Sequence, residues 1–353
     1  MDTATFRILD TISSHLGDSL SINQLTDKIK ATYGTAHYAN IYEKTCELKK
    51  QRLLCTNLVG RSSIIKLNFQ NYLLIDFLAE MEIKKKLEFL TNRNDLLVLL
   101  AEVEKLLNNM CKIRSISAIN LAKNIKLNRI ELLFLLKNAE EASNYYDDTA
   151  SICAELQRLQ KKYNLKIDSL ILNENDFFDL MKSDEINPLK EALLNKTALF
   201  CPQAFWSEIR EIAKEIEIRI DRAETRPTDI SELNLTYNLS RFGYREFGPA
   251  LEQGNEICVE YLITAVLLRN DARRTKAVPI ILAKNDFKTN LLVFLSHKFG
   301  TSGKLLGLLK ALYDIKPSKE IEETMRLLRI LETEEIQADE RSILQEMRLY
   351  DAI

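Results

Sequence analysis

Three polar side chains near the N-terminus share a spacing that suits the recognition of bases. His37, Asn40 and Lys44 lie at positions i, i+3 and i+7 of a predicted helix over residues 36–51, so they face the same side of it. An asparagine amide can read adenine through two hydrogen bonds, and a lysine can reach guanine or phosphate. The spacing therefore predicts contact with a duplex groove. The same helix is predicted to pack four other residues inward: Tyr38, Ile41, Thr45 and Leu48.

The predicted elements around this helix are two earlier helices and two later strands. Apolar residues at helical spacing indicate a helix over 6–16, and Ser21 with Gln24 forms the capping-box pattern of a second helix that ends near Ile29. Strands are predicted over 53–59 and 63–68, joined by a turn. Arg61 in that turn and Lys66 on the second strand are candidates for contact with phosphate or the minor groove.

Three helices followed by a β-hairpin resemble the winged helix-turn-helix domains common in prokaryotic transcription factors, here over residues 1–72. The resemblance implies double-stranded DNA as the partner and the insertion of the third helix into the major groove. Residues 1–70 hold nine Lys or Arg and six Asp or Glu, a net charge of +3, whereas the whole chain carries −2. Because Glu47 lies one turn from Lys44 and would repel phosphate, protein contact or a plain structural role stays an alternative for this module.

Two carboxylates lie on predicted strands in the middle of the chain. Strands are predicted over 113–119, 130–136 and 165–172, which places Glu131 and Asp168 on the second and third of them. This order of elements, with the later sequence Leu-Phe-Cys-Pro-Gln-Ala-Phe-Trp at 199–206, resembles the minimal nucleotidyltransferase domain of the DNA polymerase β superfamily. The resemblance covers residues 111–220.

The resemblance implies three carboxylates that hold two Mg²⁺ ions and a Gly-Ser turn that admits a triphosphate. The Asp-x-Asp motif falls on Arg129-Ile130-Glu131, the third carboxylate on Asp168 and the Gly-Ser pair near Ser117-Ala118. A guanidinium at position 129 repels the dication that an aspartate would bind. We therefore expect an inactive nucleotidyltransferase-like domain with no cofactor. Glu131 and Asp168 are the only candidate catalytic residues, and Mg²⁺ is expected only if transfer activity survives.

A competing interpretation makes residues 119–137 a second helix-turn-helix, with a first helix and turn over 121–127. The uniformly apolar run 132–136 argues against it, because such a run is typical of a buried strand.

The chain of 353 residues has room for several domains, and its nine glycines and six prolines favour helices. We predict an α+β fold that is mostly helical. Its predicted parts are the winged helix (1–72), linker helices (73–110), a degenerate nucleotidyltransferase-like mixed α/β domain (111–220) and a C-terminal helical domain (221–353).

Composition also excludes several classes of function. The six cysteines form no C-x-x-C pair and there are only three histidines, so no zinc or other metal site is predicted. No stretch of about twenty uncharged apolar residues exists for a membrane span, and the N-terminus lacks the apolar core of a signal peptide, so we expect a cytoplasmic protein. The predicted function is a DNA-binding transcription regulator or scaffold with a pseudoenzyme domain. The alternatives are an active Mg²⁺-dependent nucleotidyltransferase and a protein-interaction module such as an antitoxin-like protein. A protein partner and a homodimer stay open.

Overall fold

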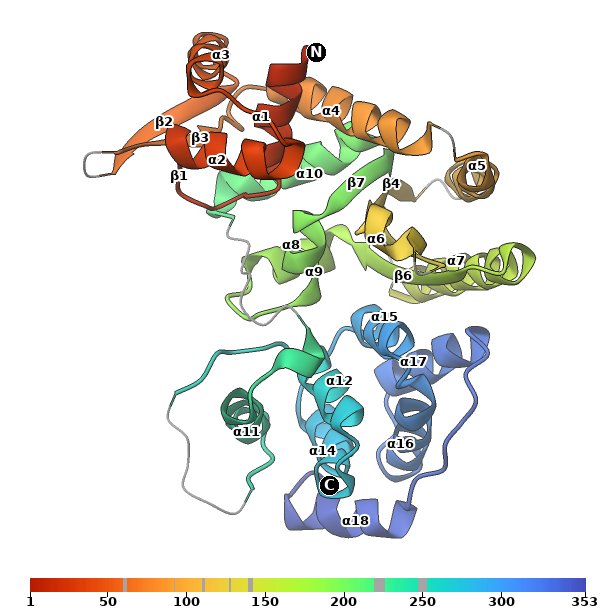
Figure 1. Cartoon of the computed structure of the whole chain (residues 1–353). Coiled ribbons are helices and arrows are strands. Elements are labelled where there is room, and N and C mark those ends of the chain that lie inside the picture. The colour runs from red at the N-terminus through yellow and green to blue at the C-terminus, as the bar shows by residue number, and fades with distance from the viewer. Residues whose placement is uncertain are drawn as a thin grey trace.

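The computed structural model describes residues 1–59, 62–91, 93–109, 112–126, 128–138, 142–218, 226–246 and 253–353. The described chain is α+β and mostly helical with two small sheets, which confirms the predicted general class. Figure 1 shows three layers: an N-terminal module (residues 1–72), a central sheet with its helices, and a group of C-terminal helices (residues 226–353).

The N-terminal module combines three helices with a three-stranded antiparallel sheet. Its elements are α1 (Thr3–Ser13), β1 (Leu20–Ser21), α2 (Ile22–Tyr33), α3 (Tyr38–Lys50), β2 (Leu54–Val59) and β3 (Ser62–Leu67). The strand order is β1-β3-β2. The order of three helices and two longer strands is as predicted, but α2 continues four residues past the predicted end near Ile29 and α1 lies three residues earlier than predicted. The sequence does not predict β1, because two residues are too few to show an alternating pattern.

Local signals explain how α2 begins and ends. The predicted capping box is present: Ser21 Oγ accepts a hydrogen bond from the Gln24 N–H at 3.4 Å, and Gln24 Oε1 accepts one from the Ser21 N–H at 2.9 Å. Gly34 follows α2 with φ of 81°, a backbone region that glycine enters without Cβ strain. The chain therefore turns sharply before α3.

The core of the module is built from the apolar faces of these elements. Leu9 on α1, Ile29 on α2, Leu48 on α3 and Ile65 on β3 are all fully buried and belong to one hydrophobic cluster. Full burial of each such side chain contributes about 1.5–3 kcal/mol.

Two further helices lead into the central sheet, as predicted for residues 73–110: α4 (Leu73–Leu90) and α5 (Asn94–Asn109). The sheet has the order β6-β5-β4-β7, in which β5 and β6 are parallel and the other neighbours antiparallel. The strands are β4 (Ile113–Ile119), β5 (Arg129–Leu136), β6 (Lys166–Asn173) and β7 (Lys196–Phe200).

Helices connect and cover these strands. The crossover that the parallel pair requires is α7 (Ala142–Tyr163). The others are α6 (Leu121–Lys126), α8 (Glu174–Lys182), α9 (Pro188–Leu194) and α10 (Pro202–Glu215). On α10, Phe205 and Trp206 are fully buried and meet edge to face, with ring centroids 5.5 Å apart. The conspicuous Phe-Trp pair of the sequence is therefore part of the core.

The competing prediction of a second helix-turn-helix over residues 119–137 is wrong. After the short helix α6, the chain enters β5, which pairs with β4 on one side and β6 on the other. Its residues from Ile130 to Leu136 are all buried. A strand enclosed on both edges and both faces needs an uninterrupted apolar sequence, which explains this run.

The C-terminal layer consists of the 3-10 turn η1 (Pro227–Asp229) and eight helices within the described ranges. These are α11 (Glu232–Arg241), α12 (Val259–Arg269), α13 (Ala272–Thr275), α14 (Ala277–Lys284), α15 (Thr289–Phe299), α16 (Ser302–Ile315), α17 (Lys319–Ile330) and α18 (Glu340–Leu349). Of these, α15 packs against β6 and α17 against α7, which joins the layer to the central sheet. Most of the predicted boundary at 221–228 lies outside the described residues.

No helix in the described ranges is both long enough and apolar enough to cross a membrane.

A buried ion pair joins α4 to β7. Lys196 Nζ donates to Glu82 Oε1 at 2.7 Å, and the Ala198 N–H donates to Glu82 Oε2 at 3.0 Å. Both charged side chains are buried. Burial opposes the ionisation of Glu82, but the charges of Lys196 and Lys85 hold its pKa below the usual value. Lys85 also lies 2.8 Å from Asp10 of α1, so the same group of charges extends to the N-terminal module.

We expect Glu82→Gln to lower the free energy of unfolding by about 3–5 kcal/mol, because it leaves Lys196 buried without a counter-charge. Urea unfolding followed by circular dichroism measures the loss. The control is Glu88→Gln on the same helix, where the glutamate is 60% exposed and 4.0 Å from Lys84, and where almost no change is expected. Equal losses in the two variants would contradict the importance of this pair.

Candidate functional site

The register of two parallel strands brings the predicted carboxylates together. Glu131 on β5 lies directly opposite Asp168 on β6. Arg129 precedes Glu131 by two residues and therefore points to the same face of the sheet. Both carboxylates are almost completely buried, with exposed fractions of 2% and 0%. Glu131 and Asp168, the two carboxylates left in the mapped catalytic motif, are thus neighbours in space.

Arg129 lies between the two acids. Its Nη2 atom is 2.7 Å from Asp168 Oδ2 and 3.0 Å from Glu131 Oε1. A guanidinium that bridges two carboxylates neutralises them with short, charge-assisted hydrogen bonds. Each of the two carboxylates is therefore paired with the guanidinium of Arg129.

The remaining oxygen of each acid is bound by the C-terminal end of α15. His297 Nδ1 is 2.7 Å from Asp168 Oδ1, and Lys298 Nζ is 2.9 Å from Glu131 Oε2. Lys166 on β6 binds the helix end in return, because its Nζ donates to the His297 carbonyl oxygen at 2.8 Å. Cations at a helix C-terminus are also favoured by the helix dipole. The acids therefore attach the C-terminal helices to the sheet.

The ionised form of Asp168 is strongly favoured. Burial alone would raise its pKa, but the hydrogen bond with His297 and the charges of Lys166 and Arg129 hold the pKa below the usual 3.8. Asp168 is thus a charged anchor at neutral pH and has no free oxygen for a metal.

The geometry does not favour two-metal chemistry. In the part of the chain that the structure describes, no group of three or more His, Cys, Asp or Glu side chains could hold a metal ion. Ser117 and Ala118, where the Gly-Ser pair was mapped, lie inside β4 and are buried. The turn comes later, at Asn120, whose φ is 48°.

On the N-terminal module, two of the predicted base-reading residues are available to a partner. His37 is the N-cap of α3 and Asn40 lies in its first turn, and both side chains are exposed. Helices that enter a major groove use their N-terminal residues for base contacts. The position of these two residues agrees with that use.

The two lysines predicted to contact phosphate are paired with acidic side chains. Lys44 Nζ lies 2.8 Å from Asp2 and 2.6 Å from Glu47, and Lys66 Nζ lies 2.6 Å from Glu217. Although burial acts the other way, the hydrogen bonds from Lys44 and Thr5 lower the pKa of Asp2 to about 2, so the first pair is ionised at neutral pH. Either lysine must leave an acid before it can bind phosphate. Arg61 lies outside the described residues.

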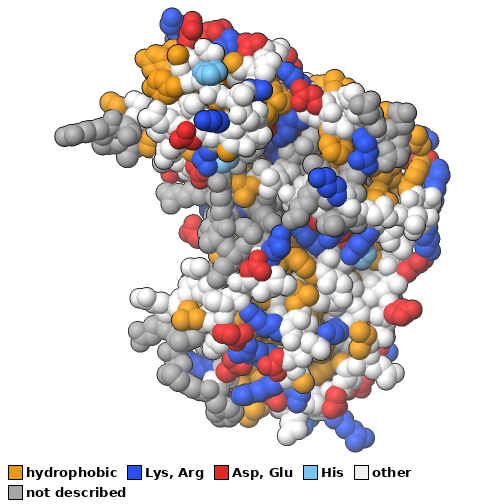
Figure 2. Space-filling view, viewed as in Figure 1, with side chains coloured by type: hydrophobic (Ala, Val, Ile, Leu, Met, Phe, Trp, Pro, Cys, Tyr) orange, Lys and Arg blue, Asp and Glu red, His pale blue; other side chains and the backbone are white. Residues whose placement is uncertain are grey.

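The outer face of α3 also differs from the prediction in its aromatic residues. Tyr38 was expected to pack inward with Ile41, Thr45 and Leu48; those three are buried, but Tyr38 is 48% exposed. It stacks on Tyr42, with ring centroids 6.0 Å apart and an interplanar angle of 24°. The inward prediction for Tyr38 is therefore wrong: at the first residue of α3, its ring packs on Tyr42 and stays outside the core. Figure 2 shows hydrophobic side chains gathered over α3, whereas positive and negative side chains are interspersed over the rest of this face.

The functional cluster contains residues that the sequence did not single out. His297 and Lys298 are 129 and 167 residues away from the acids that they bind. Their one local signal is their place in the last turn of α15, where basic residues are common in any case. Nothing in the sequence indicates which acids they contact.

Comparisons with known proteins identify no relative: no family model, no curated protein and no solved structure matches the chain.

We expect Asp168→Asn to destabilise the protein at neutral pH by about 1.5–3 kcal/mol, because Arg129 and His297 lose a charged hydrogen-bond partner while Arg129 keeps Glu131. The contribution of Asp168 is present above its unfolded pKa, near 3.8, and is lost as the pH falls through its lower folded pKa. The difference in unfolding free energy between wild type and variant should therefore shrink below about pH 3.8. Urea titrations at several pH values measure it, with exposed Asp27→Asn as the matched control. A difference that stays constant down to the lowest pH would refute this role.

Proposed function

We propose that the N-terminal module is a winged helix-turn-helix that binds double-stranded DNA. The observation that carries the proposal is its topology: three helices, an antiparallel β1-β3-β2 sheet, and a third helix whose first turn exposes His37 and Asn40. In winged helix-turn-helix domains, the third helix reads the major groove of DNA while the hairpin lies against the sugar-phosphate backbone of the DNA. The five described cysteines are free, in keeping with a cytoplasmic location as part of the proposal.

The module also offers charge for the phosphate backbone. Lys30 of α2, Lys49 and Lys50 in the last turn of α3, and Arg52 just after it are all exposed. Together with the local net charge of +3, these residues would supply the part of the binding energy that does not depend on sequence. Because the whole chain is nearly neutral, binding would be confined to this layer.

We further propose that residues 111–220 form a nucleotidyltransferase-like domain without transfer activity. The order β4-α6-β5-α7-β6, with Glu131 beside Asp168, supports the likeness. The position of Arg129 between these acids supports the loss of chemistry. The domain would then serve as a scaffold between the DNA-binding module and the C-terminal helices, in a transcription regulator.

Duplex binding tests the first proposal. A fluorescent pool of mixed-sequence duplexes should bind with an affinity that falls steeply as salt rises. Against the best sequence selected from the pool, His37→Ala with Asn40→Ala should weaken binding at least tenfold, since a good base contact contributes about 1–3 kcal/mol. Fluorescence anisotropy measures both effects.

Two further variants complete this experiment. Lys49→Ala with Lys50→Ala should weaken binding to all sequences and reduce its salt dependence, whereas Lys105→Ala, an exposed lysine of α5, should change neither. No salt-dependent binding by the wild type, or unchanged affinity in the His37 and Asn40 variant, would reject the proposed reading face.

The stacked tyrosines favour a second candidate for the same face, namely protein contact. Exposed aromatic residues are over-represented in the centres of protein interfaces. In that case the double variant Tyr38→Ser with Tyr42→Ser would lower the sedimentation coefficient, because the assembly would dissociate. The His37 and Asn40 variant would bind duplexes as the wild type does. The two outcomes separate a DNA-reading helix from a dimerising or partner-binding one.

We expect no Mg²⁺-dependent transfer of any of the four labelled nucleotides by the wild-type protein, to itself or to added RNA. The reason is that the Arg129 guanidinium pairs with both Glu131 and Asp168, the two carboxylates that would have to hold the metal. Gel electrophoresis of the reaction products measures incorporation. A labelled product that disappears in Asp168→Asn would establish the active transferase instead.

A further inference from the structure

Helix α4 carries apolar side chains on all of its sides, but the rest of the chain covers only one of them. On the covered side, where α4 packs on α10 and β7, Ile75 and Leu78 are fully buried. On the opposite side Leu73, Ile83 and Leu87 are 58%, 45% and 61% exposed. Figure 1 shows α4 at the upper edge of the molecule, with α10 beneath it. A helix that is apolar all round is typical of one that is buried on all sides.

The exposed side of α4 is a narrow stripe along the helix. Its members follow one another in steps of three and four residues: Leu73, Asp76, Glu80, Ile83 and Leu87. This spacing keeps side chains in one line along an α-helix, and it is the spacing at which two helices pack side by side. The 18 residues of α4 span about 27 Å. The stripe is therefore shaped to receive a second helix of similar length.

The stripe is complementary to its own reverse. Leu73 and Leu87 are each seven residues from Glu80, and Asp76 and Lys84 are each four residues from it. When a second α4 runs antiparallel with Glu80 at the centre, Leu73 faces Leu87 and Asp76 faces Lys84. A two-fold axis makes each of these contacts occur twice. A parallel arrangement would instead place like charges opposite each other.

The charges of the stripe allow this pairing. Asp76 is exposed and is in no ion pair within the described chain. Lys84 is 32% exposed, and its contact with Glu88 is long, at 4.0 Å. Glu80, at the centre, is paired with the amino group of Met1. This pairing reduces the repulsion between two copies of Glu80 that meet at the axis.

The first turns of α5 extend the apolar surface. Leu97 and Val98 are 44% and 57% exposed. Single exposed hydrophobic residues are normal, whereas their concentration in one region indicates an interaction surface. Of the thirteen large hydrophobic side chains that are exposed in the described chain, six lie between positions 72 and 98: Tyr72, Leu73, Ile83, Leu87, Leu97 and Val98.

We propose that α4 packs against α4 of a second copy of this chain, antiparallel about a two-fold axis near Glu80, and that the protein is a homodimer in solution. A second copy fits better than an unrelated protein because the apolar and charged positions of the stripe match their own reverse. The inference does not depend on DNA binding, and either can fail without the other.

Sedimentation velocity of the full chain tests the proposal. The wild type should sediment as a dimer at micromolar concentration. Leu87→Ser should weaken the dimer at least tenfold, because the buried leucine contact is lost twice in each dimer. The matched control is Leu349→Ser on α18, where the leucine is 72% exposed and lies outside the stripe. This control should sediment as the wild type does.

Charge reversal tests the antiparallel register. Asp76→Lys and Lys84→Glu should each dissociate the dimer, since each variant places two pairs of like charges across the axis. Mixed in equal amounts, the two variants should associate again, because every reversed position then faces an opposite charge. An unrelated partner does not predict this recovery. Asp27→Lys, at an exposed position of α2, should leave the dimer unchanged.

Three results would each overturn the proposal: a wild type that is monomeric up to its solubility limit, a dimer that Leu87→Ser leaves intact, or charge variants that stay apart when mixed. A dimer that dissociates in Tyr38→Ser with Tyr42→Ser, but not in Leu87→Ser, would place the interface on α3 instead. Circular dichroism checks that each variant is folded. If a charge variant is not, Leu87→Ser alone decides, because its side chain is exposed and its loss should leave the fold intact.

Discussion

Two carboxylates buried side by side must be neutralised, and this constraint determines how the C-terminal helices attach to the central sheet. Glu131 and Asp168 are adjacent because β5 and β6 run parallel in register. Arg129 neutralises them from within the sheet, and the end of α15 does so from outside it. The packing of the C-terminal helices on β6 is therefore more than apolar contact. These ion pairs join the end of α15 to the sheet and engage all four carboxylate oxygens.

Buried charges are also paired between the N-terminal module and the central sheet. Glu82 and Lys196 lie buried between α4 and β7, and Lys85 extends the group of charges to Asp10 in the N-terminal module. Buried charges thus lie at both boundaries between layers, where apolar packing alone would allow several arrangements. A charge pair that is satisfied in only one geometry selects that geometry, even where it adds little net stability.

Local patterns predicted the elements well, and long-range contacts not at all. The capping box at Ser21 and the apolar run of β5 each report on a few neighbouring residues, and both predictions are correct. The exposure of Tyr38 depends on where α3 meets its neighbours, and the pairing of Lys66 with Glu217 joins positions 151 residues apart. Of the candidate site, the proximity of Glu131 and Asp168 was implied by the family resemblance alone. Nothing indicated His297 and Lys298, because helical spacing carries no information about which strand a helix end will contact.

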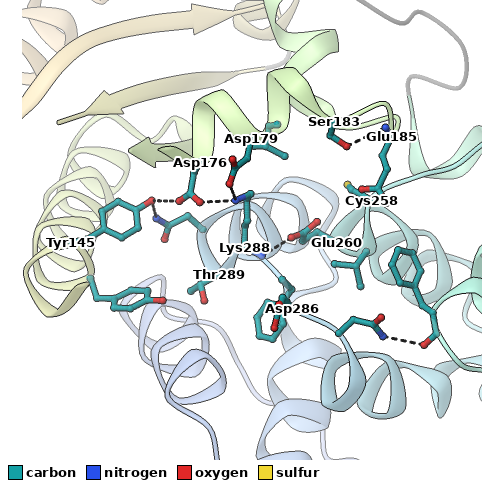
Figure 3. Close-up of a pocket in the computed structure, with 17 residues that line it drawn as sticks. Tyr145, Asp176, Asp179, Ser183, Glu185, Cys258, Glu260, Asp286, Lys288 and Thr289 are labelled. Carbon is teal, nitrogen blue, oxygen red and sulfur yellow. Dashed lines mark hydrogen bonds and ion pairs between the residues drawn. The ribbon is translucent and has the colours of Figure 1, made fainter. Parts of the chain in front are cut away.

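The helix α15 carries charged contacts at both of its ends. Lys288, its N-cap, pairs with Asp176 of α8 (Figure 3), and His297 and Lys298 in its last turn bind the carboxylates of the sheet. Eleven residues of α-helix span about 16 Å. The helix is therefore fastened to the central domain at two separated points, which fixes its direction as well as its position.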